Sequence, residues 1–216
     1  MSCILKEDHL RILKRSRRRA LWIHLAGICL TLVILTLLFR NEMDRVPIVK
    51  AHRAIRAEYD ALAARYELLS LLRTKPLTVG QALDITDVIL EQKDVPIPLV
   101  LGIMEQESVF RAEAVSDKGA RGLVQLMPLV WQTYSDHAEF RAAEWQIHEA
   151  SMNVRVGLRY LSDLKKEFGD WKRVLRAYVG GPQRAEDPAM DDYANAVLRK
   201  TAFYEKEVKL ALNVME

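Results

Sequence analysis

Apolar and polar residues follow one another along most of this chain with the period of an α-helix, and strand-like alternation is absent. From Leu77 onward, stripes of apolar residues at helical spacing are separated by turns. The pattern predicts helices over residues 78–93, 99–109, 129–138, 151–168, 171–178 and 191–208. These helices predict an all-α fold with one compact domain at residues 77–205, since about 130 residues suffice for a core of their own. Residues 206–216 are assigned to the end of the last helix and a C-terminal tail.

The N-terminal part differs, because residues 21–39 form an apolar run without a charge. As a helix this run is about 28 Å long, close to the hydrocarbon thickness of a bilayer. A basic cluster precedes it, made of Lys14, Arg15, Arg17, Arg18 and Arg19, and fewer cations follow it. The bias predicts a single-pass transmembrane helix with a cytoplasmic basic segment at residues 1–20 and the rest of the chain outside the cytoplasm. A cleavable signal peptide is disfavoured, because its shorter apolar core and small-residue cleavage site are not evident.

Residues 40–76 are predicted to form a helical stalk, with one helix over 48–73 that contains no proline or glycine. Apolar residues recur in it every seven positions, and a second set lies four residues after the first three of them: Ile48, Ile55, Leu62 and Leu69, with His52, Tyr59 and Tyr66. Such a seam is typical of a coiled coil. Two interpretations stay open. Residues 48–73 pair with a second copy or an envelope-complex partner, or the stripe packs on the chain's own domain.

Within the predicted helix 99–109, one carboxylate lies on the apolar stripe. Advancing about 100° per residue places Glu107 within roughly 60° of Val100 and Ile103. Glu105 lies about 160° from Glu107, on a mixed face where we expect it to be solvated. A carboxyl among apolar groups is harder to ionise, and a proton kept near neutral pH suits a general acid. The alternative is a buried glutamate satisfied by a hydroxyl or an arginine.

Four stretches beginning at Glu107 carry a family resemblance. They are Glu107-Ser108, then Gly122-Leu123-Val124-Gln125 followed by Leu126-Met127-Pro128, then residues 153–161, and finally Ala177-Tyr178-Val179-Gly180-Gly181-Pro182. The turn glycines Gly119 and Gly122 indicate that the backbone passes close to another group there. In this order and spacing, the stretches resemble the soluble-lytic-transglycosylase-like family, whose catalytic domain is related to goose-type lysozyme. The resemblance covers residues 77–204 and implies a lysozyme-like helical domain.

The resemblance implies a role for each matching residue. Glu107 corresponds to the catalytic glutamate, and the implied substrate-binding residues are Ser108, Ser116, Gln125, Met127 and Tyr178. The tyrosine at the position of Tyr178 usually hydrogen-bonds the catalytic glutamate in this family. Val179 stands where the family has asparagine, which removes one polar contact to the glycan and puts subsite preference or turnover in doubt. The other aromatic residues at helical spacing, Tyr193 and Tyr204 among them, are predicted to pack in the core.

The resemblance also implies a reaction. A single Glu107 would protonate the glycosidic oxygen between MurNAc and GlcNAc and then act as a base, so that the substrate's own C6 hydroxyl gives a 1,6-anhydroMurNAc end. Asp117 would permit lysozyme-type hydrolysis if it faced the cleft, but a solvated loop acid is the preferred interpretation. A weakly active or inactive peptidoglycan-binding scaffold is the other alternative. With the predicted anchor, this implies a domain in the periplasm, held at the inner membrane of a bacterium with peptidoglycan strands as its partner.

Charge, cysteines and histidines bear on nucleic-acid binding, disulfides and metal sites. The net charge of +3 for 216 residues is small, and much of it lies in the first nineteen residues, so nucleic-acid binding is not implied. Cys3 would lie in the cytoplasm and Cys29 in the bilayer, which leaves no disulfide for the exported part. The five histidines show no metal-ligand spacing. We therefore expect neither a metal nor an organic cofactor.

Overall fold

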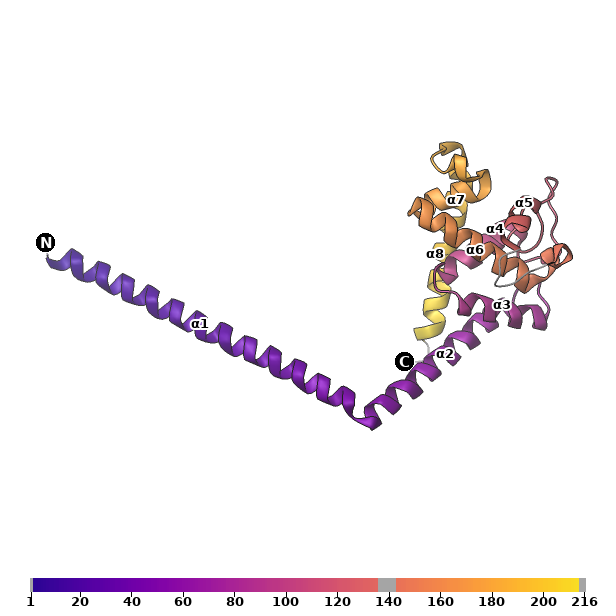
Figure 1. The fold of residues 1–216 in the computed structure, drawn as a ribbon. Helices are drawn as coiled ribbons and strands as arrows, with labels where there is room; N and C mark the ends of the chain where they lie inside the picture. Colours follow the sequence, from indigo (N-terminus) through magenta and orange to yellow (C-terminus); the bar gives the residue numbers. More distant parts are fainter. Residues whose placement is uncertain (1, 136–142, 214–216) are drawn as a thin grey trace. The chain divides into compact units, whose positions relative to one another are not determined.

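The computed structural model describes residues 2–135 and 143–213. Over this range the chain is helical, as predicted, and only isolated bridges, Val115 to Arg121 and Arg121 to Leu126, pair backbone outside helices. The helices are α1 (Ser2–Arg45), α2 (Pro47–Arg73), α3 (Val79–Glu91), α4 (Ile97–Ser108), α5 (Pro128–Ser135), α6 (Ala150–Phe168), α7 (Trp171–Gly180) and α8 (Asp191–Asn213), with short 3-10 turns η1 (Glu144–His148), η2 (Pro182–Arg184) and η3 (Pro188–Met190) (Figure 1). The expected end of the helix at 129–138 lies partly outside the described residues. The chain divides into two compact units, residues 1–59 and 60–216.

The first unit is built around α1, which is one continuous helix (Figure 1). Its apolar part, Leu21–Met43, is 23 residues long with a mean hydropathy of 2.4, and its side chains are exposed. It is long and apolar enough to cross a membrane, and it extends four residues past the predicted run at 21–39. Pro47 then begins α2, a position where the missing N–H of proline leaves no bond unmade.

Within the second unit, the seam predicted on α2 is largely exposed. Leu62 and Tyr66 are 65% and 66% exposed, although they belong to the second unit, whose core instead receives Leu68 and Leu72 from α2. Only Leu69 of the seam packs partly against that core. Within the second unit, therefore, only Leu69 of the stripe packs on the chain's own domain, and for residues 48–59 that interpretation stays a prediction. Pairing of residues 48–73 with a second copy or an envelope protein stays a prediction.

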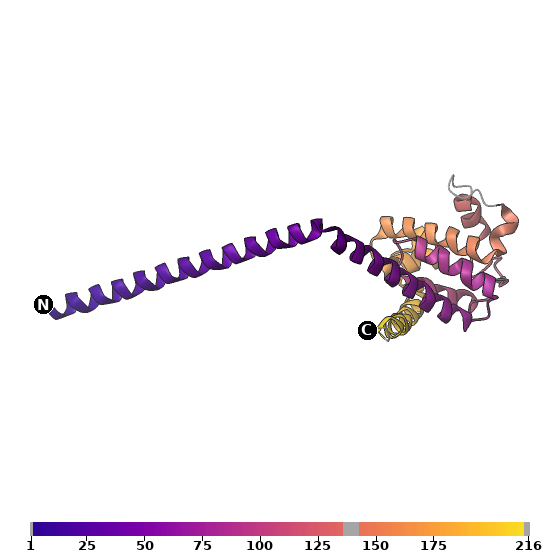
Figure 2. The same ribbon diagram turned by 90° about the horizontal axis from the view of Figure 1, so that it is seen from below.

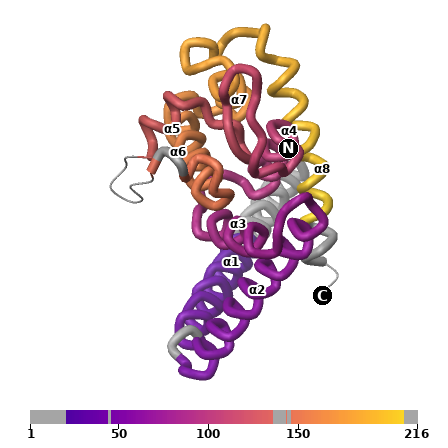
Figure 3. The backbone as a smooth tube through the Cα atoms, turned by 90° about the vertical axis from the view of Figure 1, so that its right-hand side faces the viewer, coloured from indigo at the N-terminus to yellow at the C-terminus, as the bar shows by residue number. Residues whose placement is uncertain are grey.

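The second unit has α4 at its centre. From Leu99 to Met104 every residue of α4 is buried, so the helix is covered on all sides. Helix α8 packs along it, while α6 contacts both α3 and α7 (Figures 2 and 3). The close approach of α8 is possible because of Gly102. A Cβ at this position would lie 3.0 Å from Thr201 Oγ1 and 3.2 Å from the Val197 carbonyl oxygen. The pair α4 and α8 forms the framework on which the site is built.

Candidate active site

Glu107 lies in the last turn of α4, where the chain leaves the helix through an unusual bend. Val109 and Phe110 both have left-handed backbones, with φ of 52° and 59°. Consecutive non-glycine residues in this region are strained, and such strain is concentrated at functional sites. The ring of Phe110, 1% exposed, fixes the bend in the core. The bend leaves Glu107 at the end of the buried helix.

The carboxyl of Glu107 is partly buried, and one neighbouring hydroxyl binds it. Tyr193 in the first turn of α8 donates a hydrogen bond to Glu107 Oε1. Burial raises the pKa of Glu107 to about 7, and the Tyr193 hydrogen bond opposes this rise without cancelling it. Burial and the charge of Glu107 raise the pKa values of Tyr193 and Tyr178 well above their usual range, so both hydroxyls remain protonated donors. The site thus contains a carboxyl that is close to half protonated at neutral pH.

The hydrogen bond that the resemblance implied for Tyr178 is made by another residue. Tyr178 donates to the backbone carbonyl of Val124 at 2.6 Å, and Tyr193 binds Glu107 instead. Tyr193 packs against the core as predicted, but its hydroxyl also binds Glu107, which was not predicted. Its position in the sequence shows only that it shares a face of α8 with Lys200 and Tyr204, seven and eleven residues further on, and does not indicate the contact with Glu107.

The loop after Glu107 is held by a buried amide. The Nδ2 of Asn153 donates to the carbonyls of Arg121 and Ile147, at 3.0 and 2.8 Å, and its Oδ1 accepts from Val124 N at 3.0 Å. Gly122, with φ of 80°, is the close approach that the sequence indicated. A Cβ there would lie 2.2 Å from the Asn153 amide nitrogen. Asn153, fully buried on α6, is thus a structural residue of the site; the resemblance included it in the stretch 153–161 but gave it no role.

Two predicted binding residues, Ser108 and Ser116, use their hydroxyls within the protein. Ser108 is 2% exposed, and its hydroxyl shares its one proton between the carbonyls of Met104 and Leu123, at 3.0 and 2.8 Å. This places Ser108 behind Glu107, as a link between α4 and the loop. The hydroxyl of Ser116 accepts from Ala120 N at 3.0 Å and closes the turn that contains Asp117, which is exposed.

The remaining predicted residues differ in their exposure. The amide nitrogen of Gln125 donates to the carbonyls of Ala114 and Gly122, at 3.1 and 2.9 Å, and Gln125 itself has a φ of 50°. Its side chain therefore also supports the loop. Met127 is 42% exposed and Val179 is 45% exposed, so both are accessible from solvent. Of the residues predicted to bind substrate, Met127 is the most accessible side chain.

Glu105 was predicted to be solvated, but in the structure its carboxylate is bound by two side chains of α8. Tyr204 donates to its Oε2 at 2.6 Å and Lys200 donates to its Oε1 at 3.0 Å. Burial opposes its ionisation, but these hydrogen bonds and the charges of Lys200 and Lys75 together lower the pKa of Glu105. The mixed face of α4 is covered because α8 packs on it, which a helical wheel of α4 alone does not reveal.

Comparison with known proteins identifies the family of the chain. The model of the transglycosylase SLT domain family matches residues 85–197, just over half of the chain. Among solved structures, the chain resembles the lytic transglycosylase Slt from Pseudomonas aeruginosa, crystallised as an inactive mutant with a glutamate changed to glutamine. The two share 23% sequence identity with a TM-score of 0.51, over 60% of this chain and 24% of that one. The likeness shows the same lysozyme-like helical fold, and this chain matches about a quarter of the length of Slt. On the family match, the chain belongs to the transglycosylase SLT domain family.

Proposed function

We propose that this protein is a membrane-anchored peptidoglycan lytic transglycosylase, which cleaves the β-1,4 bond between MurNAc and GlcNAc. The observation that carries the proposal is Glu107, a partly buried carboxyl whose pKa is raised to about 7 in a domain of the SLT family. A general acid works best when its pKa is near the working pH, and burial supplies that match here. The inactive glutamate-to-glutamine mutant of Slt is consistent with a catalytic glutamate in the related fold.

In the proposed reaction, protonated Glu107 donates its proton to the glycosidic oxygen as the bond to C1 breaks and the sugar gains oxocarbenium character. The resulting carboxylate then removes the proton from the C6 hydroxyl, whose oxygen bonds to C1. The products are a 1,6-anhydroMurNAc end and a free GlcNAc end, and Glu107 is again protonated. Tyr193 stabilises the carboxylate between the two steps, because its hydroxyl donates to Oε1. No second carboxylate takes part in this scheme, since Asp117 is an exposed loop residue.

Substrate contacts are proposed for residues beside this acid. Met127 is exposed, and Tyr178 lies near enough for the charge of Glu107 to raise its pKa. Gln125 and Ser116 shape the loop and present their remaining acceptor capacity to the glycan. Ser108 acts through Glu107 by holding the end of α4.

The anchor is proposed to be the apolar part of α1. Its 23 residues exceed the length needed to cross a bilayer, and the basic cluster before it favours a cytoplasmic N-terminus. The SLT domain is then periplasmic and the protein lies in the bacterial inner membrane, next to its substrate. Alkaline extraction of membranes and protease protection of spheroplasts test this arrangement. A chain released by alkali, or a domain resistant to external protease, would contradict it.

Digestion of purified sacculi by the full-length protein in detergent, followed by mass spectrometry, tests the reaction. We expect muropeptides with anhydro ends, which are lighter than hydrolysed ends by one water, and none with Glu107→Gln. Hydrolysed ends would identify a lysozyme-type hydrolase instead. Val179 favours a further alternative, because an exposed valine stands where the family has an amide. Binding of sacculi without release of muropeptides would identify a peptidoglycan-binding scaffold.

A further inference from the structure

The hydroxyl that binds Glu107 depends on how the start of α8 is held. Helix α8 begins at Asp191, and Tyr193 lies in its first turn. The first N–H groups of a helix have no partners within the helix, so this turn is its least constrained part. The chain enters α8 from η2 and η3, two short 3-10 turns without a buried residue. Contacts from outside α8 must therefore fix the position of Tyr193.

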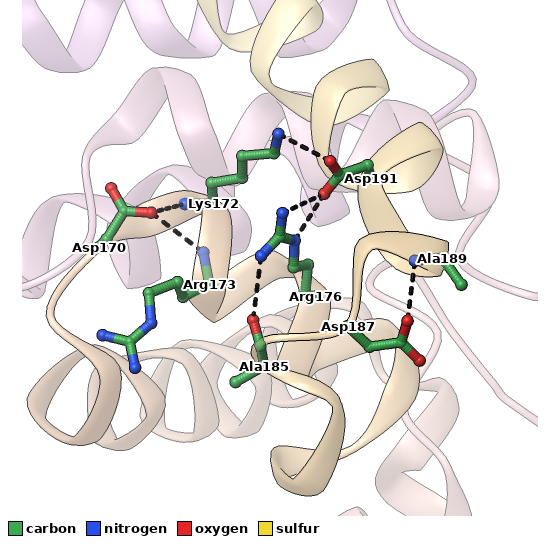
Figure 4. Close-up of polar contacts among 8 residues, drawn as sticks. All are labelled: Asp170, Lys172, Arg173, Arg176, Ala185, Asp187, Ala189 and Asp191. Atoms are coloured by element: carbon green, nitrogen blue, oxygen red, sulfur yellow. Dashed lines mark hydrogen bonds and ion pairs between the residues drawn. The ribbon is translucent and has the colours of Figure 1, made fainter.

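Asp191 makes such contacts with α7 (Figure 4). The Nε of Arg176 donates to Asp191 Oδ1 at 2.6 Å, and the Nζ of Lys172 donates to Oδ2 at 3.0 Å. Each carboxylate oxygen thus faces its own cation. The side chain of Arg176 is only 14% exposed, and its Nη1 also donates to the carbonyl of Ala185 at 3.5 Å. The rigid guanidinium fork makes this a directional contact.

The contact persists at neutral pH. The hydrogen bond from Lys172, and after it that from Arg176, outweigh desolvation and lower the pKa of Asp191, so the carboxyl is ionised. A negative charge at the first residue of a helix also interacts favourably with the helix dipole. Asp187, also drawn in Figure 4, accepts a hydrogen bond from Ala189 N and a second one from Arg184, so it holds η3 and not α8.

We propose that Asp191 is a positioning residue for the acid, which holds the Tyr193 hydroxyl on Glu107 by fixing the first turn of α8 to α7. Arg176 stands two residues before Tyr178, so the contact joins the two helices whose tyrosines face Glu107. Asp191 itself touches neither the acid nor the substrate in this scheme. The kinetic test of this role rests on the proposed function, whereas the titration of Glu107 does not.

The pKa of Glu107 reports the Tyr193 hydrogen bond directly. The titratable groups that interact with Glu107 are Tyr193 from α8 and Tyr178 from α7. Since the hydrogen bond from Tyr193 favours the carboxylate and lowers the pKa, its loss must raise the pKa further. A change in stability alone leaves this pKa where it is.

The test uses the full-length protein in detergent micelles with ¹³C-labelled glutamate side-chain carboxyls, and Glu107→Gln identifies the Glu107 resonance. We expect Asp191→Ala to raise the pKa of Glu107 in the same direction as Tyr193→Phe, and the double variant to go no further than Tyr193→Phe alone. Asp192→Ala, a change of the same kind at the next residue, is the matched control and leaves the pKa unchanged. A parental Glu107 pKa in folded Asp191→Ala overturns the proposal, and so does an additive double variant.

Catalysis gives a second readout. We expect kcat of Asp191→Ala to fall about tenfold, with KM within about twofold, because misplacement of a catalytic contact by about 1 Å lowers rates by up to about 10². Should Asp191→Ala fail to fold, Lys172→Met/Arg176→Met removes both cations and keeps Asp191, and a parental Glu107 pKa in that variant overturns the proposal equally. A parent protein that releases no muropeptides refutes the proposed function, while the titration still decides the role of Asp191.

Discussion

The two faces of α4 that carry Glu105 and Glu107 have much in common, yet the pKa values of these residues move in opposite directions. Both carboxyls are partly buried, and each accepts a hydrogen bond from a tyrosine of α8. Two things differ. Glu107 is buried more deeply, and Glu105 lies near Lys200 and Lys75, which have no counterpart among the groups that shift the pKa of Glu107.

The comparison shows how burial, a tyrosine hydroxyl and a lysine charge each shift the pKa of a carboxyl. At Glu107 the tyrosine hydrogen bond does not outweigh burial, and the pKa of the carboxyl rises to about 7. At Glu105 a cation in direct contact makes ionisation favourable, as expected for opposite charges a few ångströms apart. Helix α8 therefore contacts both carboxyls. Its first turn provides the hydroxyl that binds Glu107, and two turns further on Lys200 forms an ion pair with Glu105.

The largest expected difference is in activity. Glu107→Gln should reduce the release of muropeptides from sacculi by about 10² to 10⁴, because general acid–base catalysis is typically worth that much. The same change at Glu105 keeps its size and its contact with Tyr204, so activity should stay within about threefold of the parent, since amide and carboxylate differ here only in an ion pair worth at most about 1 kcal/mol. Equal losses in the two variants would show that Glu105 acts in the reaction or that Glu107 has no special role.

The second difference is in how the free energy of unfolding depends on pH, because the pKa shifts of the two carboxyls have opposite signs. The pKa of Glu107 is about 7 when folded and near 4.5 when unfolded, so the folded state binds the extra proton between these values. Parent stability is lowered as pH rises through this window, by about 3 kcal/mol once complete. Glu107→Gln removes this penalty and should be more stable than the parent above pH 7, by up to about 3 kcal/mol.

Glu105 provides the internal comparison for that measurement. Its folded pKa is lowered, so its contribution to stability is present above the unfolded pKa and is lost as pH falls through the folded pKa. Glu105→Gln should therefore be less stable than the parent at neutral pH, with a difference that disappears in acid. Denaturant unfolding followed by tryptophan fluorescence over a pH series measures both variants. A Glu107→Gln advantage that does not change with pH would contradict the raised pKa.

The apolar position of Glu107 could be predicted from the sequence, because it depends only on residues of the same helix. Its position on an apolar stripe follows from the period of one helix, and the helices around it were found within a few residues of their true ends. The prediction for Glu105 was wrong because α8, far along the chain, covers that face. A helical wheel gives the angle of a residue about its own helix and nothing about the partner helix.

The contacts of the tyrosines were beyond reach for the same reason. Tyr178 and Tyr193 lie fifteen residues apart on different helices, and both reach the region of Glu107. Which hydroxyl reaches the carboxyl depends on how α7 and α8 pack, and the structure assigns that contact to Tyr193. The role of Asn153 was not predicted either, although the residue begins the stretch 153–161, because the function of a buried amide is recognised only when the carbonyls it binds are known.

Gly102 allows a test of both faces at once, since it sets the separation of α4 and α8. In Gly102→Ala the added Cβ would lie 3.0 Å from Thr201 Oγ1 and 3.1 Å from Thr201 N, so α8 must move by a few tenths of an ångström. Overpacking typically destabilises by about 1–3 kcal/mol, against a gain of up to about 1 kcal/mol in helix propensity. We expect a net loss of about 1 kcal/mol in thermal or denaturant unfolding, with reduced activity.

The matched control for that variant is Gly80→Ala in α3. A Cβ there has Thr78 Oγ1 at 4.0 Å as its nearest neighbour, so the substitution should be neutral or slightly stabilising. If Gly102→Ala behaved like Gly80→Ala, the close packing of α8 would not be what brings its tyrosines to the two carboxyls.

The smallest effect should come from Lys200→Met, which removes the cation in direct contact with Glu105. The salt bridge is about one third exposed on both sides, so its loss should lower the free energy of unfolding by less than about 1 kcal/mol. The pKa of Glu105 should nevertheless rise toward that of Glu107, while Tyr204 and Lys75 still restrain it. Carbon-13 titration of the Glu105 resonance measures the change, with the exposed Lys206→Met on the same helix as control. An unmoved Glu105 pKa would mean that Tyr204 and Lys75 suffice for ionisation, and the contrast with Glu107 would then depend on the surroundings of the two tyrosines and not on the lysine.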